Sequence, residues 1–118
     1  VIKAMRMPKD SDSEKKIRDE KMQEGYKAAT EIPLVIVEYC NKALNICDDI
    51  SKLMAESRAS DVGTGAHMSI AGARSAAYNV RLNLNSLKDQ KYINSTKSKL
   101  SKLLSDCEKK LQIVTGRV

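Results

Sequence analysis

Apolar residues recur along most of this chain at intervals of three and four, the period of a helix with one buried face. The pattern runs from Glu14 to Val114, and no segment shows the two-residue alternation of a half-buried strand. Short polar links interrupt it, and no internal repeat is present. The pattern therefore predicts an all-α fold, an antiparallel bundle of three to four helices.

The first of these helices is expected over Glu14–Thr30. It follows a polar link in which Ser11 or Ser13 provides a capping side chain. Its apolar stripe is thin, and the mixed charges around it indicate a solvated face. Ahead of the link, Val1 to Met7 has the pattern of the end of another helix, which Pro8 would close. We therefore expect an upstream part to be missing.

A second helix is expected over Glu31–Glu56, with Pro33 in its first turn, where a missing N–H is tolerated. It carries the strongest apolar stripe of the chain and should be the main core helix. The residues predicted to face the core are Ile32, Ile36, Tyr39, Cys40, Ala43, Cys47, Ile50 and Met54.

The segment Ser60–Asp89 contains no proline and is predicted to form one helix, with Ser60 as its N-cap and Asp61 in its first turn. Its first half is rich in glycine and alanine. Because glycine costs about 1 kcal/mol in a helix interior relative to alanine, its repeated use here indicates close helix packing or a nearby ligand.

The last helix should run from Gln90 to Val114, and the tail from Thr115 to Val118 should fray. The residues of this helix predicted to face inward are Ile93, Leu100, Leu104, Cys107, Leu111 and Val114.

Composition narrows the classes of function. The 118 residues carry a formal net charge of +6 but include no Phe or Trp, so aromatic platforms for nucleic-acid bases are scarce. The basic residues are also interleaved with acidic ones. The apolar run Ile32–Val37 is too short to span a membrane. We therefore expect neither nucleic acid nor membrane as a partner.

A domain with so little aromatic mass and a flat Gly/Ala-rich helix should bury the flat face of that helix in a homodimer.

The three cysteines do not predict a disulfide. Cys40 and Cys47 lie seven residues apart on one expected helix, roughly 10 Å along its axis, and no signal peptide is present. These features favour a cytoplasmic setting. A zinc site from both residues with Cys107 and His67 is conceivable, but no CxxC or HxxxH spacing supports it, and buried thiols are the preferred interpretation.

The string SDVGTGA followed by GARSAAYNVRLNLNSLKD resembles the signature of the formimidoyltetrahydrofolate cyclodeaminase and methenyltetrahydrofolate cyclohydrolase family. That signature has a Ser-Asp pair, a small-residue helix, Asn-Val-x-x-Asn-Leu and a closing Asp, here Ser60, Asp61, Asn79, Asn83 and Asp89. The strings MRMPKDSDSEKK and KAATEIPL resemble the family as well. Its Pro-Gly-Gly-Gly turn has no counterpart here, so the resemblance implies that residues 1–118 are the C-terminal part of one such domain.

The resemblance implies a folate-dependent one-carbon enzyme, acting as a homodimer and without a metal. Its substrate would be a tetrahydrofolate derivative, through cyclodeamination of 5-formimidoyltetrahydrofolate or hydrolysis of 5,10-methenyltetrahydrofolate. A non-catalytic helical scaffold or oligomerisation module of the same family is the alternative, and a basic nucleic-acid-binding bundle is a third hypothesis.

The candidate catalytic residue is Asp61, which would relay a proton or stabilise the cationic one-carbon bridge; as an alternative it stabilises a helix N-terminus. Asn79 and Asn83, four apart and on one helix face, are candidate folate ligands or interhelical hydrogen-bonding groups. Asp61 and Asn79 are 18 residues apart, roughly 27 Å along a straight helix. They would therefore serve opposite ends of the ligand or different sites, one of them completed by a neighbouring subunit.

Overall fold

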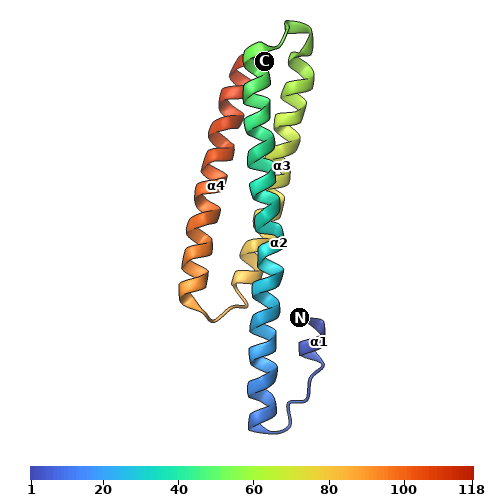
Figure 1. Cartoon of the computed structure of the whole chain (residues 1–118), viewed down its shortest axis with the longest axis vertical. Coiled ribbons are helices and arrows are strands. Elements are labelled where there is room, and N and C mark those ends of the chain that lie inside the picture. The colour runs from blue at the N-terminus through green and yellow to red at the C-terminus, as the bar shows by residue number, and fades with distance from the viewer.

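The computed structural model describes residues 1–118 and contains no strand, which confirms the predicted all-α fold. A short helix α1 (Ile2–Met5) precedes the long helix α2 (Asp12–Leu53), one 3₁₀ turn η1 (Glu56–Arg58), and the helices α3 (Ala59–Leu84) and α4 (Gln90–Arg117). Figure 1 shows α2, α3 and α4 packed along one another as an elongated bundle. The whole chain measures 67 × 24 × 15 Å along its principal axes. The first turns of α2 project beyond this bundle, with α1 alongside.

Helix α2 is one continuous helix of 42 residues, so the predicted division into Glu14–Thr30 and Glu31–Glu56 is wrong. It begins one turn after Pro8, and the Ser11 hydroxyl caps it by accepting from the Glu14 N–H at 3.1 Å. Pro33 lies in its interior, where proline leaves the carbonyl four residues earlier without its helical donor. That carbonyl belongs to Ala29, and it accepts a hydrogen bond from the Asn83 side chain of α3 at 2.9 Å. A partner from a neighbouring helix therefore allows α2 to continue through its proline.

The face of α2 predicted to be the core is largely exposed. Ile32 is 68% exposed and Tyr39 64%, whereas the buried side chains of the same region are Leu34, Val37 and Leu44. Of the predicted residues, Cys40, Cys47 and Met54 do pack against the core. The physical reason is that α2 is apolar on two faces, and α3 and α4 cover one of them.

Helix α3 ends at Leu84 rather than at Asp89, and its N-cap is Arg58 rather than Ser60, which lies within the helix. The segment after Leu84 is a turn, and Asp89 caps α4 by accepting from the Tyr92 N–H at 3.1 Å. Asp89 therefore closes the link between two helices, because its carboxylate satisfies a free N–H at the start of the next helix.

The glycines of α3 bring it close to α2. A Cβ atom on Gly72 would lie 3.0 Å from the Cys40 Sγ, and one on Gly65 would lie 3.5 Å from the Cys47 Sγ. Cys40 and Cys47 are seven residues apart on α2, and their partners Gly72 and Gly65 are seven residues apart on α3 in the opposite order. These contacts fix an antiparallel register, and they account for the small residues by close helix packing.

Helix α4 has the predicted inner face: Ile93, Leu100, Cys107 and Val114 are buried, and Leu104 and Leu111 pack against the core. It continues to Arg117, so the prediction of a frayed tail from Thr115 is wrong. The physical reason is an ionic contact, since the Arg117 guanidinium donates to the Asp48 carboxylate and, at 2.9 Å, to the Ser51 hydroxyl.

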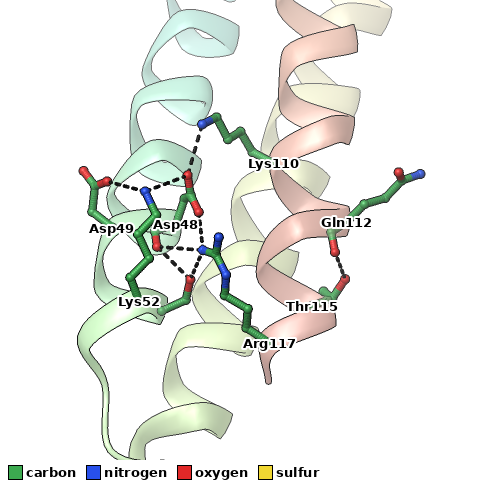
Figure 2. Close-up of polar contacts among 8 residues, drawn as sticks. Asp48, Asp49, Lys52, Lys110, Gln112, Thr115 and Arg117 are labelled. Atoms are coloured by element: carbon green, nitrogen blue, oxygen red, sulfur yellow. Dashed lines mark hydrogen bonds and ion pairs between the residues drawn. The ribbon is translucent and has the colours of Figure 1, made fainter.

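Asp48 is the centre of a polar cluster that joins the end of α2 to the end of α4 (Figure 2). Its side chain is buried, and besides Arg117 it accepts from Lys110 at 3.1 Å and lies 3.6 Å from the Lys52 ammonium group. The hydrogen bond from Lys110, followed by that from Arg117, holds the pKa of the Asp48 carboxyl below its ordinary value. The carboxylate therefore stays charged, and it anchors the C-terminal turns of α4.

Replacing Asp48 with Asn should weaken the loss of stability in acid. Because the folded-state pKa of Asp48 is lowered, its stabilising contribution is complete above the unfolded value of about 3.9 and is lost as the pH falls through the folded value. We expect Asp48→Asn to melt below the unsubstituted chain at neutral pH, and the two melting temperatures to converge between about pH 5 and pH 2.

The measurement is thermal unfolding followed by circular dichroism across that pH range. Asp106→Asn, at an exposed carboxylate of α4, is the matched control and should track the unsubstituted chain. Equal pH slopes for Asp48→Asn and the unsubstituted chain would contradict this account of the cluster.

Candidate functional site

A groove of about 340 Å³ opens between α2 and α3 near the middle of α2. Its apolar wall comes from α2 and its amides from α3, and the lining residues are Ala29, Ile32, Pro33, Ile36, Asn79 and Asn83. Both candidate ligand residues of the sequence analysis thus lie in the same groove. Apolar walls with a few convergent polar groups are typical of sites for small organic ligands.

Asn83 is half-buried, and it is already bound to the fold through its hydrogen bond to the Ala29 carbonyl. An amide nitrogen carries two hydrogens and the amide oxygen accepts, so this bond uses only part of the hydrogen-bonding capacity of the side chain. The structure thus shows an interhelical hydrogen bond for Asn83 and leaves it at the wall of the groove.

Asn79 lies one turn before Asn83 and is exposed. Ala29 is bonded to Asn83, so in the antiparallel register Pro33 lies beside Asn79, and both line the groove. The Asn79 side chain makes no hydrogen bond within the chain, and its amide is therefore free to bind a ligand.

Asp61 lies in the first turn of α3, as predicted, at the opposite end of that helix from the groove. Its side chain is 75% exposed, and its nearest cation is Arg58, at 4.0 Å. The 18 residues that separate it from Asn79 correspond to roughly 27 Å of helix. The structure therefore does not bring the candidate catalytic residue and the candidate ligand residues together within one protomer.

Comparison with known proteins gives a family for this arrangement. A sequence model of the family described as formiminotransferase-cyclodeaminase matches residues 1–102. The chain belongs to this family. The matched residues include α2, α3 and the first half of α4, and hence the groove and Asp61.

Relatives within the family include enzymes of two names. The chain is 32% identical over 106 residues to a methenyltetrahydrofolate cyclohydrolase of Methylorubrum extorquens, covering 90% of this chain and 51% of the relative. It is 29% identical over 110 residues to a formimidoyltransferase-cyclodeaminase of Gallus gallus, covering 91% of this chain and 20% of the relative. It is 26% identical over 117 residues to the protein of that name from Sus scrofa, covering 99% and 22%. The chain thus spans about half the length of the bacterial relative and about a fifth of the animal ones.

Asp89, the closing Asp of the motif, ties the loop between α3 and α4 to helix α2. Asp89 forms an ion pair with Lys27 at 2.8 Å, which is the main reason why the pKa of the Asp89 carboxyl is lowered. Gln23 holds the same loop by donating to the Ser86 carbonyl at 3.0 Å and accepting from the Lys88 N–H at 2.9 Å.

One turn further along α2, Glu31 accepts from the Tyr92 hydroxyl at 2.6 Å. Burial and this bond raise the pKa of Tyr92 to about 12. The mixed charges of residues 14–30 predict a solvated face, whereas Gln23 and Lys27 in fact contact the loop between α3 and α4. The signal for these contacts was the spacing of Gln23, Lys27 and Glu31, which are four residues apart and hence on one side of the helix.

The thiols take structural places. Cys40 and Cys47 face the glycines of α3, Cys107 is fully buried, and desolvation raises the pKa of all three, that of Cys107 to about 11. A raised pKa disfavours the thiolate, the form that reacts and binds metals. No group of three or more His, Cys, Asp or Glu side chains is placed to hold a metal ion, so the zinc hypothesis gains no support.

No helix combines the length and the apolar character needed to cross a membrane.

The bond between Asn83 and the Ala29 carbonyl should be worth more while Pro33 is present. Asn83→Ala leaves this carbonyl without its donor, and we expect a loss of about 1–2 kcal/mol in the free energy of unfolding. In the background Pro33→Ala the backbone N–H of residue 33 can bond the same carbonyl, so the cost of Asn83→Ala should fall by at least half.

Denaturant unfolding of the two single variants and the double variant measures this coupling. Asn79→Ala is the control, because that side chain is exposed, and it should change the free energy by less than about 0.5 kcal/mol. Additive effects of the Pro33 and Asn83 substitutions would show that Asn83 is not the replacement donor.

Proposed function

We propose that this chain belongs to a folate-dependent one-carbon enzyme that acts on the carbon bridging N5 and N10 of tetrahydrofolate. The observation that carries the proposal is the 32% identity, over 90% of the chain, to a protein named methenyltetrahydrofolate cyclohydrolase. Hydrolysis of 5,10-methenyltetrahydrofolate is accordingly the favoured reaction. Cyclodeamination of 5-formimidoyltetrahydrofolate is the second candidate, which the animal relatives support by name.

The groove between α2 and α3 suits one end of such a substrate. A pterin ring is flat, and its edge alternates hydrogen-bond donors with acceptors. Ile32 and Ile36 offer an apolar surface for the ring, and the free amide of Asn79 offers both a donor and an acceptor for its edge. In this proposal Asn79 binds the ligand directly, while Asn83 binds it with the hydrogen-bonding capacity that Ala29 leaves free.

Both reactions pass through a tetrahedral carbon flanked by nitrogens. In the hydrolysis, water adds to the cationic methenyl carbon and loses a proton, and the ring opens as one carbon–nitrogen bond breaks and that nitrogen gains a proton. A carboxylate suits this sequence, because it stabilises the cation and carries the proton between water and nitrogen. Asp61 is the candidate: its side chain is open to water. Neither reaction, written in this way, requires a metal.

The site within one protomer is divided, because Asp61 and the groove lie at opposite ends of α3. The assignment of residues 1–118 to the C-terminal part of one family domain stays a prediction, as does the cytoplasmic setting. We also propose that the protein acts as a homodimer, in which a second subunit completes the site.

Asp61→Asn in the intact protein tests the catalytic assignment. The substitution keeps the shape of the side chain and removes its charge. A catalytic role predicts at least a hundredfold loss of turnover on 5,10-methenyltetrahydrofolate or 5-formimidoyltetrahydrofolate, with the helical circular dichroism signal unchanged.

Asp106→Asn is the matched control and should retain full turnover. If Asp61→Asn keeps near-normal turnover and loses at most about 1 kcal/mol of stability, Asp61 only stabilises the start of α3. If the unsubstituted protein neither binds nor converts either folate, the non-catalytic scaffold is the better description of this family member.

A further inference from the structure

Helix α2 has a proline close to the point where its buried contact with the bundle begins. All of its buried residues lie at Thr30 or beyond, and Pro33 is one of them. Residues 12–29 contain no buried residue, and their first turns project beyond the bundle (Figure 1). We call residues 12–32 of α2, together with α1, which packs on them, the arm. Since sharp bends in helices occur mostly at proline, Pro33 marks the place where the arm can bend relative to the bundle.

The arm is attached to the bundle mainly through polar contacts. Those of Gln23, Lys27 and Glu31, described above, join it to the loop after α3 and to the start of α4. Tyr26 adds a partly buried ring that packs against the core. Ion pairs between exposed side chains stabilise a fold only weakly. The arm is therefore held less firmly than the part of α2 that contributes to the core.

Asn83 closes the gap that Pro33 leaves in the hydrogen bonds of α2. The Ala29 carbonyl, which has lost its helical donor, accepts from the Asn83 side chain at 2.9 Å. This bond ties the last turns of the arm to α3. Because the proline ring pushes against the same carbonyl, a bend at Pro33 would carry Ala29 away from Asn83 and break the bond. The bond between Asn83 and Ala29 therefore favours the straight form of α2.

The groove of the candidate site spans this bend point. Ala29 and Ile32 line it from the arm. Pro33 and Ile36 line it from the other side of the bend point, together with the two asparagines of α3. A bend would separate these walls, so a ligand in the groove makes more contacts with the straight form. Since a ligand shifts an equilibrium toward the form that it binds better, occupation of the groove favours straight α2.

The remaining hydrogen-bonding capacity of Asn83 adds to this coupling. The bond to Ala29 uses one N–H of the amide and leaves the second N–H and the oxygen for a ligand. A ligand that donates to the amide oxygen polarises the amide, and a polarised amide is a stronger donor. Such a ligand therefore strengthens the bond that holds Ala29.

We propose that Pro33 is a hinge between the arm and the bundle, that Asn83 holds this hinge straight, and that a ligand in the groove closes it further. The choice of a reduced folate as that ligand rests on the function proposed above. The hinge itself rests only on the contacts of Pro33, Ala29 and Asn83. Binding of the ligand then fixes the arm, and with it α1, relative to the bundle.

Hydrogen exchange of the backbone amides within residues 30–37 of the intact protein measures opening of the hinge, because a bend at Pro33 breaks the helical bonds of this turn. Without ligand, Asn83→Ala should speed this exchange at least about fivefold. In the background Pro33→Ala the same substitution should change it less than about twofold, since the backbone N–H of residue 33 then bonds the Ala29 carbonyl.

Asn79→Ala is the matched control, because Asn79 lines the groove without bonding Ala29, and it should leave the exchange of residues 30–37 unchanged. Residues 100–107 of α4 are the internal reference. Unchanged exchange of residues 30–37 in Asn83→Ala would overturn the hinge. An equal acceleration at residues 100–107 would overturn it as well, because the variant would then have lost only global stability.

Exchange in the presence of saturating 5-formyltetrahydrofolate, a stable reduced folate, tests the effect of the ligand on the hinge. The folate should slow the exchange of residues 30–37 at least about fivefold in the unsubstituted protein, and less than about twofold in Pro33→Ala, which has no hinge to close. Binding that leaves this exchange unchanged in the unsubstituted protein would overturn the coupling. Absence of binding would refute the proposed function and the coupling with it, while the variants without ligand still decide the hinge.

Discussion

The close antiparallel contact between α2 and α3 is the constraint on which the rest of the structure depends. Two glycines of α3 meet two thiols of α2, and the Asn83 amide meets the carbonyl that Pro33 leaves free. A side chain at Gly72 would press against the Cys40 Sγ, and without Asn83 the part-buried Ala29 carbonyl would lack its partner. These contacts set both the spacing and the register, so they also decide which side chains line the groove.

The same constraint explains why the helix with the strongest apolar pattern presents much of it to solvent. With Pro33, Cys40 and Cys47 turned toward α3, the isoleucines of the neighbouring face turn away from the core. The ionic cluster at Asp48 and the loop contacts of Gln23 and Lys27 hold α4 on the other side of α2. Three helices fixed in this way leave one broad uncharged face, and the candidate folate residues lie along it.

Much of the fold was predictable from local patterns. The helical period, the Ser11 cap and the inner face of α4 follow from short stretches of sequence, because neighbours within a few residues decide them. The passage of α2 through Pro33 was not predictable in this way, since it depends on Asn83, which is 54 residues from Ala29 in the chain. The buried face of α2 was missed for a related reason: two apolar faces share one period, and only the contacts with α3 choose between them.

The candidate site was likewise predictable only where neighbouring residues in the sequence decide it. The position of Asp61 in a first turn and the shared face of Asn79 and Asn83 follow from helix geometry. The role of Asp89 as a cap and ion-pair partner required the loop after Leu84, where no glycine or proline marks the end of the helix. The support from Gln23, Lys27 and Glu31 lies across a helix interface, which periodicity alone does not show.

The proposed function requires that the groove beside Asn79 binds a folate. The most direct measurement is a nuclear magnetic resonance titration of the intact, ¹⁵N-labelled protein with a stable reduced folate such as 5-formyltetrahydrofolate. We expect the side-chain amide resonances of Asn79 and Asn83 to shift with a common saturable dependence on ligand concentration, and that of Asn94, exposed on α4, to stay unchanged. Saturable shifts that leave both groove asparagines unchanged, or the absence of any shift, would contradict it.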